Sequence, residues 1–202
     1  MGSVILAFNH LTLADVFVLL KVLFSEANKE IKEVIVPGSR RHWGNPVFGL
    51  VMRAGLIIGV RVIPIVQHYE RGIYFPAYTA SLDRKFVKAL HQVLSKKGCV
   101  ILFAPEGHRS ENGYLQPPQK GVEFLLKLVE RKGLNTVAMP IGIEPQEGFS
   151  RGINFGRRFT IHFGRSLSPE EIGELVLELK ISPAWIIMQQ IAALLPARLI
   201  RG

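Results

Sequence analysis

The chain alternates short apolar segments with longer segments of helical periodicity, and this alternation restricts the fold more than any other feature. Continuous apolar runs predict strands that are covered on both faces of a sheet. The segments between them predict amphipathic helices. Together they predict an α/β fold, with a mixed, mostly parallel β-sheet flanked by α-helices. The expected strands are residues 4–8, 34–36, one or two within 56–66, 99–103, 136–143 and 159–163, and the expected helices are about 12–27, 46–53, 82–96, 119–131 and two that begin at Ser168 and Ser182.

Residues that favour turns and helix starts set the expected boundaries of these elements. Pro37-Gly38 is expected to stop the second strand. Ser81 is expected to cap the helix over residues 82–96. Ser168-Pro169-Glu170-Glu171 combines a cap, a proline at the first helical position and acids in the first turn, which predicts a helix start.

Length and composition predict one domain over residues 1–202, with a motif-bearing core at about 4–165 and C-terminal helices at about 168–200. The apolar share of 48% argues against a disordered chain. The formal net charge of +9 predicts an anionic partner, which could be nucleic acid, anionic lipid or a phosphorylated substrate. We expect no nucleic acid, because no basic stripe is interleaved with stacking aromatic residues.

One interval of the chain, between Glu33 and Glu70, has no acidic residue and therefore carries a net positive charge. Apolar residues alternate there with Arg40, Arg41 and Arg53. This mixture suits an anionic membrane surface. It equally suits a buried helix and strand whose arginines extend to solvent, and the sequence leaves both readings open.

A single cysteine, Cys99, excludes a disulfide within the chain and indicates a protein on the cytosolic side. No segment is typical of a membrane span, because charged residues interrupt the best candidates. The N-terminus lacks a basic segment ahead of an apolar one, so no signal peptide is expected.

The first motif, Asn9-His10 followed by Asp15, directly follows the first predicted strand. A spacing of five does not align two side chains on one helix face. His10 and Asp15 can therefore meet only if His10 precedes the helix and folds back over its first turn. Asp15 would then orient the imidazole and leave its other nitrogen as a general base for a substrate hydroxyl. The alternative is that Asp15 only stabilises the positive end of the helix.

The second motif follows the strand at 99–103 and contains Glu106, Gly107 and Arg109. Glu106 can bond substrate hydroxyls, and Gly107 permits unusual backbone angles or close approach of a ligand. Arg109 offers a bidentate guanidinium for phosphate. The alternative is a surface turn with a weak Glu–Arg ion pair.

The two motifs together resemble the glycerolipid acyltransferase family, which includes the lysophosphatidate and glycerol-3-phosphate acyltransferases. That family carries Asn-His-x-x-x-x-Asp followed by Phe-Pro-Glu-Gly-Thr-Arg-Ser, and this chain has matching segments at 9–15 and 103–110. Further matches are a basic pair at Arg40-Arg41, a Lys120-Gly121 pair and a Val-Pro-Val-like strand at 137–143. The resemblance covers about residues 4–165.

The resemblance implies that His10, oriented by Asp15, takes a proton from a glycerol hydroxyl that attacks the thioester of acyl-CoA or acyl carrier protein. It implies no metal and no bound cofactor, because the acyl donor is a cosubstrate. The acceptor would be a lysolipid at an anionic membrane surface, and the protein would be peripheral or monotopic on the cytoplasmic side. Residues that the resemblance assigns to substrate binding are Glu106, Gly107, Arg109, Arg40, Arg41 and Lys120.

The chain departs from the family pattern at four places, the first of which is Ala104, an inserted-looking residue before Pro105. His108 replaces a threonine, and Gln67 stands where the family's middle block has an arginine, for which Arg61 and Arg71 are the candidate replacements. Only one strand precedes the first motif, where relatives commonly carry a helical anchor. Membrane attachment would then use residues 46–66 or the last helix, although such a helix equally often covers the core.

These departures keep other functions open. The acceptor could be a lipid alcohol without phosphate, such as a lyso-amino-lipid. A basic lipid-surface module without enzymatic activity is the remaining alternative.

Overall fold

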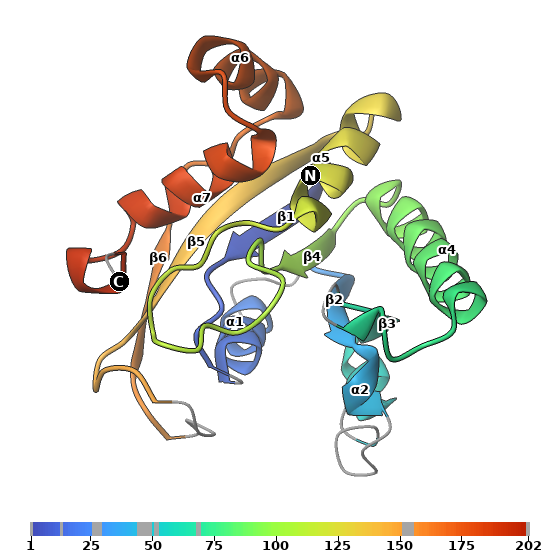
Figure 1. Ribbon diagram of the computed structural model, residues 1–202, viewed down its shortest axis with the longest axis horizontal. Helices are drawn as coiled ribbons and strands as arrows, with labels where there is room; N and C mark the ends of the chain where they lie inside the picture. Colours follow the sequence, from blue (N-terminus) through green and yellow to red (C-terminus); the bar gives the residue numbers. More distant parts are fainter. Residues whose placement is uncertain are drawn as a thin grey trace.

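The computed structural model describes residues 2–12, 14–25, 30–43, 50, 53–67, 70–150 and 156–200. It has a six-stranded sheet in the order β3-β2-β4-β1-β5-β6 (Figure 1). The strands are β1 Ser3–Phe8, β2 Glu33–Ser39, β3 Val60–Ile65, β4 Cys99–Phe103, β5 Thr136–Pro145 and β6 Phe159–Phe163. The helices are α1 Ala14–Leu23, α2 Arg40–Trp43, α4 Pro76–Leu94, α5 Lys120–Arg131, α6 Pro169–Leu179 and α7 Pro183–Ala193, with 3₁₀ helices at Gly55–Ile58 and Ala197–Leu199.

The sheet is mixed and mostly parallel, as the sequence predicts. β1 pairs in parallel with β4 and with β5, while β2 pairs in parallel with β3 and β4. β6 is antiparallel to β5 and closes one edge. Helix α1 lies on one face of this sheet, and α4 and α5 lie on the other. The predicted fold class is therefore confirmed.

Two clusters of buried apolar residues lie on the two faces of the sheet. Alternate residues of β1 point to opposite faces, so Ile5 joins one cluster and Leu6 the other. The larger cluster packs the sheet against α4, α5, α6 and α7, and the smaller packs it against α1. The last helix buries Ile186, Ile187 and Ile191 in the larger cluster, so it covers the core.

Strand β2 does not stop at Pro37-Gly38 as the sequence predicts. It runs on to Ser39, with Pro37 opposite Ile63 of β3. Its pairing with β4 ends at Ile35. The missing N–H of Pro37 therefore falls where β2 has a ladder on one side only, where proline is tolerated.

Two other predicted boundaries differ from the structure. Residues 56–66 contain one strand, because 55–58 form a 3₁₀ turn that ends at Gly59 with φ 79°. Helix α4 starts at Pro76, and Ser81 lies inside it, because proline at the first position already fits the helix. The predicted helix at 46–53 falls largely outside the described residues. At Ser168 the predicted start is confirmed: its hydroxyl accepts from Glu171 N at 3.2 Å, and Glu171 accepts from Ser168 N at 2.7 Å.

Candidate functional site

Both motifs begin at the same edge of the sheet. β1 and β4 are parallel neighbours with Ala7 opposite Phe103, so their carboxyl ends lie side by side. The chain leaves β1 into His10 and leaves β4 into Glu106. Ligands of open α/β sheets bind at such carboxyl ends. The two loops are joined directly, because Ser110 N donates to His10 O at 2.8 Å.

The His10–Asp15 pair has the predicted arrangement. His10 lies before α1, and its Nδ1 is 3.0 Å from Asp15 Oδ2. The same oxygen accepts from Leu11 N at 2.6 Å and from Thr12 N at 2.7 Å. Asp15 Oδ1 accepts from Thr12 Oγ1 at 2.8 Å. Asp15 is fully buried, while 20% of the His10 side chain is exposed. The imidazole therefore contacts a buried carboxylate on one side and is accessible from solvent on the other.

Asn9 fixes the position of the residue that follows it. Its amide accepts from Ile143 N at 2.6 Å and donates to Ile143 O at 2.9 Å, although the two residues are 134 positions apart. The His10 ring also packs edge-on against Phe8, with ring centroids 5.9 Å apart. The motif match could have drawn attention to Asn9, but its partner on β5 could not be read from the sequence.

Glu106 is inside the protein and not on the substrate surface. It is fully buried, and its two oxygens accept from His10 N at 2.7 Å and from Gln116 N at 2.9 Å. Burial, partly offset by these two bonds, raises the pKa of Glu106 to about 8. The predicted contact with substrate hydroxyls does not fit this position, because the carboxylate is occupied by two backbone donors and closed to solvent. Glu106 joins the two loops instead.

Gly107 adopts the left-handed conformation that the sequence anticipates, with φ 72°. An added Cβ would lie 2.9 Å from Gln119 Cγ, so a larger residue would collide there as well. Its carbonyl oxygen accepts from Gln67 Nε2 at 2.8 Å. Arg109 follows in the same loop and is half-buried.

Gln67 belongs to a second buried group at the carboxyl ends of β2 and β3. Glu70 is fully buried and accepts from Ser39 Oγ at 2.5 Å and from Gln67 N at 3.1 Å. Ser39 Oγ in turn accepts from Arg41 N at 3.2 Å. This group therefore links the start of α2, which carries the arginine pair, to the loop of Gly107. Neither Ser39 nor Glu70 was identified from the sequence, because no motif marks them.

The other residues predicted to bind substrate are Arg40, Arg41 and Lys120. Arg40 donates from Nε to Tyr78 Oη at 2.6 Å, and Arg41 is exposed. Lys120 is the exposed first residue of α5. The candidate replacements for a missing arginine are both used elsewhere, because Arg61 pairs with Glu33 at 2.8 Å and Arg71 with Asp83 at 3.2 Å.

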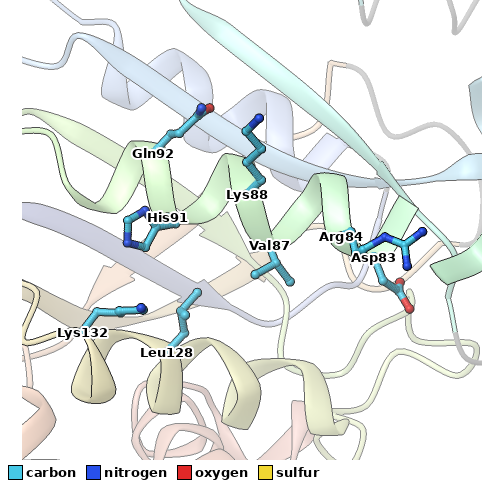
Figure 2. A pocket seen from close by; sticks show the side chains of 8 residues that line it. All are labelled: Asp83, Arg84, Val87, Lys88, His91, Gln92, Leu128 and Lys132. Atoms are coloured by element: carbon cyan, nitrogen blue, oxygen red, sulfur yellow. The ribbon is translucent and has the colours of Figure 1, made fainter. Parts of the chain in front are cut away.

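A separate groove of about 610 Å³ lies between α4 and α5 (Figure 2). Val87 and Leu128 face one another across it, and basic side chains such as His91 and Lys132 stand at its rim. None of the predicted site residues lines this groove. In the described part of the chain, no group of three or more His, Cys, Asp or Glu side chains is arranged to hold a metal ion.

The geometry places a histidine bonded to a buried carboxylate at the carboxyl edge of an α/β sheet, and a comparison with family models identifies the class of the protein. Residues 1–144 match the model of the acyltransferase family, and both motifs lie within the match. Because it spans 144 of the 202 residues, the chain belongs to the acyltransferase family, and the protein is an acyltransferase. A search of curated proteins finds no match. The predicted resemblance is confirmed.

Proposed function

We propose that this acyltransferase moves a fatty acyl group from a thioester donor to the hydroxyl of a lysophospholipid or glycerol phosphate, with His10 as general base. The observation that carries the proposal is the hydrogen bond between His10 Nδ1 and Asp15 Oδ2 at 3.0 Å. Because a carboxylate only accepts, this bond places the ring proton on Nδ1. The lone pair of Nε2 is then available to a substrate hydroxyl.

The reaction proceeds in two proton transfers. His10 Nε2 takes the hydroxyl proton while the alcohol oxygen bonds to the thioester carbonyl carbon. The tetrahedral intermediate loses the C–S bond, and the departing sulfur takes the proton from the imidazolium. The products are an ester and a free thiol, and His10 returns to its neutral state. Asp15 stabilises the imidazolium between the two transfers.

Either acyl-CoA or acyl carrier protein can serve as the donor in this scheme, because both present the same thioester. The donor is a cosubstrate, and the scheme uses no metal and no bound cofactor. No Ser or Cys side chain is bonded to His10 among the described residues, which favours direct transfer over a covalent acyl-enzyme.

The acceptor phosphate is assigned to Arg109, with Arg40 or Arg41 as a second cation. Arg109 lies one residue beyond His108 in the loop whose backbone is bonded to His10. A guanidinium can hold phosphate through two parallel hydrogen bonds. Gly107 and the exposed Lys120 are placed at the same loop and at the start of α5, where a glycerol headgroup would lie.

A second candidate acceptor is a lipid alcohol without phosphate. It is favoured by Gln67, a neutral residue whose amide bonds the Gly107 carbonyl, where the family pattern has a cation. Arg61 and Arg71 do not replace that cation, because each is paired with a carboxylate.

Acyl transfer from labelled long-chain acyl-CoA and acyl carrier protein tests the proposal, with lysophosphatidate, glycerol 3-phosphate, zwitterionic lysolipids and a lyso-amino-lipid as acceptors. We expect transfer that falls by ~10²–10⁴-fold in His10→Ala. His91→Ala is the matched control, because this histidine is exposed on α4.

The preferred acceptor decides between the two candidates. A phosphate-bearing acceptor whose KM rises in Arg109→Ala supports the first, and transfer to a non-phosphate acceptor that ignores Arg109→Ala supports the second. Full activity in His10→Ala would contradict the assignment of the base.

A further inference from the structure

We propose that the flank of the molecule formed by edge strand β3 and its two connections binds the surface of an anionic lipid bilayer. The flank comprises Leu50 and residues 53–58 before β3 and residues 70–78 after it. The inference adds a partner to the proposed function and rests on that function only for the lipid nature of the acceptor.

The flank exposes large apolar side chains on both connections. Before β3, Ile57 is 87% exposed, and Leu50, Leu56 and Ile58 are each more than half exposed. After β3, Phe75 is 85% exposed and Ile73 is more than half exposed. Single exposed apolar residues are ordinary, but here four precede β3 and two follow it, so the segments at both ends of this edge strand expose large apolar groups, as interaction surfaces do.

The first connection also carries basic residues, and acidic residues near it are either absent from the sequence or buried. Arg40, Arg41 and Arg53 lie on the first connection. No acidic residue occurs between Glu33 and Glu70, and Glu70 itself is fully buried. Apolar groups combined with arginines in an interval without acidic residues match the headgroup region of an anionic bilayer, where cations meet lipid phosphates and apolar groups reach the acyl chains.

The last helix is the other segment that the sequence offers for membrane attachment, and its packing argues against it. Its apolar residues Ile186, Ile187 and Ile191 are buried in the core. No helix of the described residues has the length and hydropathy needed to cross a bilayer. Attachment through the β3 flank would be to the bilayer surface.

One end of the flank reaches the candidate site. Arg40 follows Ser39 at the carboxyl end of β2 and is bonded to Tyr78 at the start of α4. Only β4 separates β2 from β1, which leads to His10. Neighbouring strands are about 4.8 Å apart, so β2 and β1 lie about 10 Å from one another. A lipid headgroup held at Arg40 would therefore enter at the edge of the sheet where the base lies.

Vesicle flotation measures this interaction without donor, acceptor or catalysis. The probes are vesicles of phosphatidylcholine alone and of phosphatidylcholine with an equal share of phosphatidylglycerol. We expect the wild type to bind the anionic vesicles and to release them as salt is raised. The double variants Ile57→Ser/Ile58→Ser and Ile73→Ser/Phe75→Ser each remove two apolar side chains, and Arg53→Glu reverses one charge.

We expect each double variant to bind anionic vesicles roughly tenfold or more weakly, because losing two large apolar groups exceeds the ~1.4 kcal/mol of a tenfold change. Arg53→Glu should weaken binding to anionic vesicles and leave binding to phosphatidylcholine unchanged. Leu177→Ser is the control, because this leucine is 80% exposed on α6, outside the flank. All substituted positions are exposed, so melting temperatures should be unchanged.

Unchanged vesicle binding in both double variants would overturn the inference, and so would an equal loss in Leu177→Ser. Self-association of the wild type that the same variants abolish would assign the flank to a second copy of the chain instead. Vesicle binding without acyl transfer to any acceptor would contradict the proposed function and leave the docking surface standing.

Discussion

The two loops that meet at the edge of the sheet are organised in opposite ways. In the loop from Asn9 to Asp15 the orientation of His10, the proposed base, is set locally, because the three residues bonded to Asp15 Oδ2 lie within five residues of it. The loop around Glu106 is set by residues that are distant in sequence, namely His10, Gln67 and Gln116. The orientation of the His10 ring therefore depends on neighbouring residues, whereas the backbone positions of both loops depend on bonds to other parts of the fold.

The largest effect is expected from breaking the loop from Asn9 to Asp15. In the native protein, Asp15 Oδ2 is the oxygen that faces His10, Leu11 and Thr12. Asp15→Asn leaves only one acceptor oxygen in this side chain. It also turns an N–H group toward donors, so the imidazole loses its orientation and its compensating charge. We expect kcat to fall by ~10²–10⁴-fold, measured as acyl transfer with saturating donor and acceptor.

Asp83→Asn is the control for this substitution, because Asp83 pairs with Arg71 on the surface of α4. An Asp15→Asn enzyme with wild-type kcat would show that His10 does not depend on this carboxylate.

Breaking the loop around Glu106 should affect stability first. Glu106→Ala leaves the backbone N–H groups of His10 and Gln116 buried without their acceptor. Each unsatisfied group costs about 1–3 kcal/mol, so the free energy of unfolding should fall by about 2–5 kcal/mol in denaturant titrations. The control is Glu123→Ala, on the outer side of α5, for which the free energy of unfolding should fall by less than about 1 kcal/mol.

The pH dependence of stability sharpens the same comparison. The pKa of Glu106 is raised by burial from 4.5 to about 8, so the folded chain keeps this proton to higher pH than the unfolded chain does. The free energy of unfolding should therefore decrease as pH rises through this window, by at most about 1.4 kcal/mol per pH unit. Glu106→Gln cannot titrate and should show a shallower slope. Equal slopes in both proteins would contradict the burial of an ionisable group here.

The smallest effect is expected from removing the hydrogen bond by which Gln67 supports the loop around Glu106. Gln67→Leu removes the donor to the Gly107 carbonyl, which is bonded at 2.8 Å. Losing one such bond costs about 1 kcal/mol, so the KM for the acceptor should rise roughly fivefold while the KM for the donor stays constant. Gln92→Leu on the exposed side of α4 should leave both constants unchanged. An equal rise in both KM values would indicate that Gln67 stabilises the fold as a whole and not the acceptor site.

The difference between the loops also explains how much could be predicted from the sequence. The arrangement of His10 and Asp15 follows from a few neighbouring residues and one strand end. The spacing allowed it only if His10 precedes the helix, and the match of both motifs to the family pattern favoured it. The alternation of apolar runs predicted the α/β class for the same reason, since each run carries its own signal. The burial of Glu106 could not be predicted, because it requires knowing that Gln116 folds back over the motif.

The incorrect boundaries have the same origin. Pro37-Gly38 is a local stop signal, and it is overridden because β2 has lost its β4 partner by that point. Ser81 is a plausible cap, but Pro76 starts the helix earlier. The group of Ser39, Gln67 and Glu70 has no sequence signature, because its members come from the end of β2 and from the segment that follows β3.

The amide of Asn9 satisfies both the backbone N–H and the C=O of Ile143, which two residues of a longer β1 would otherwise satisfy in a parallel ladder. Among the side chains, only an amide offers a donor and an acceptor in this fixed geometry, and glutamine is one methylene too long. Position 9 should therefore tolerate substitution as poorly as position 10. Asn9 is fully buried, so this intolerance reflects its structural contacts. A survey of variants by activity alone would count Asn9 as a catalytic residue, when its part is to extend the sheet by one rung beneath the base.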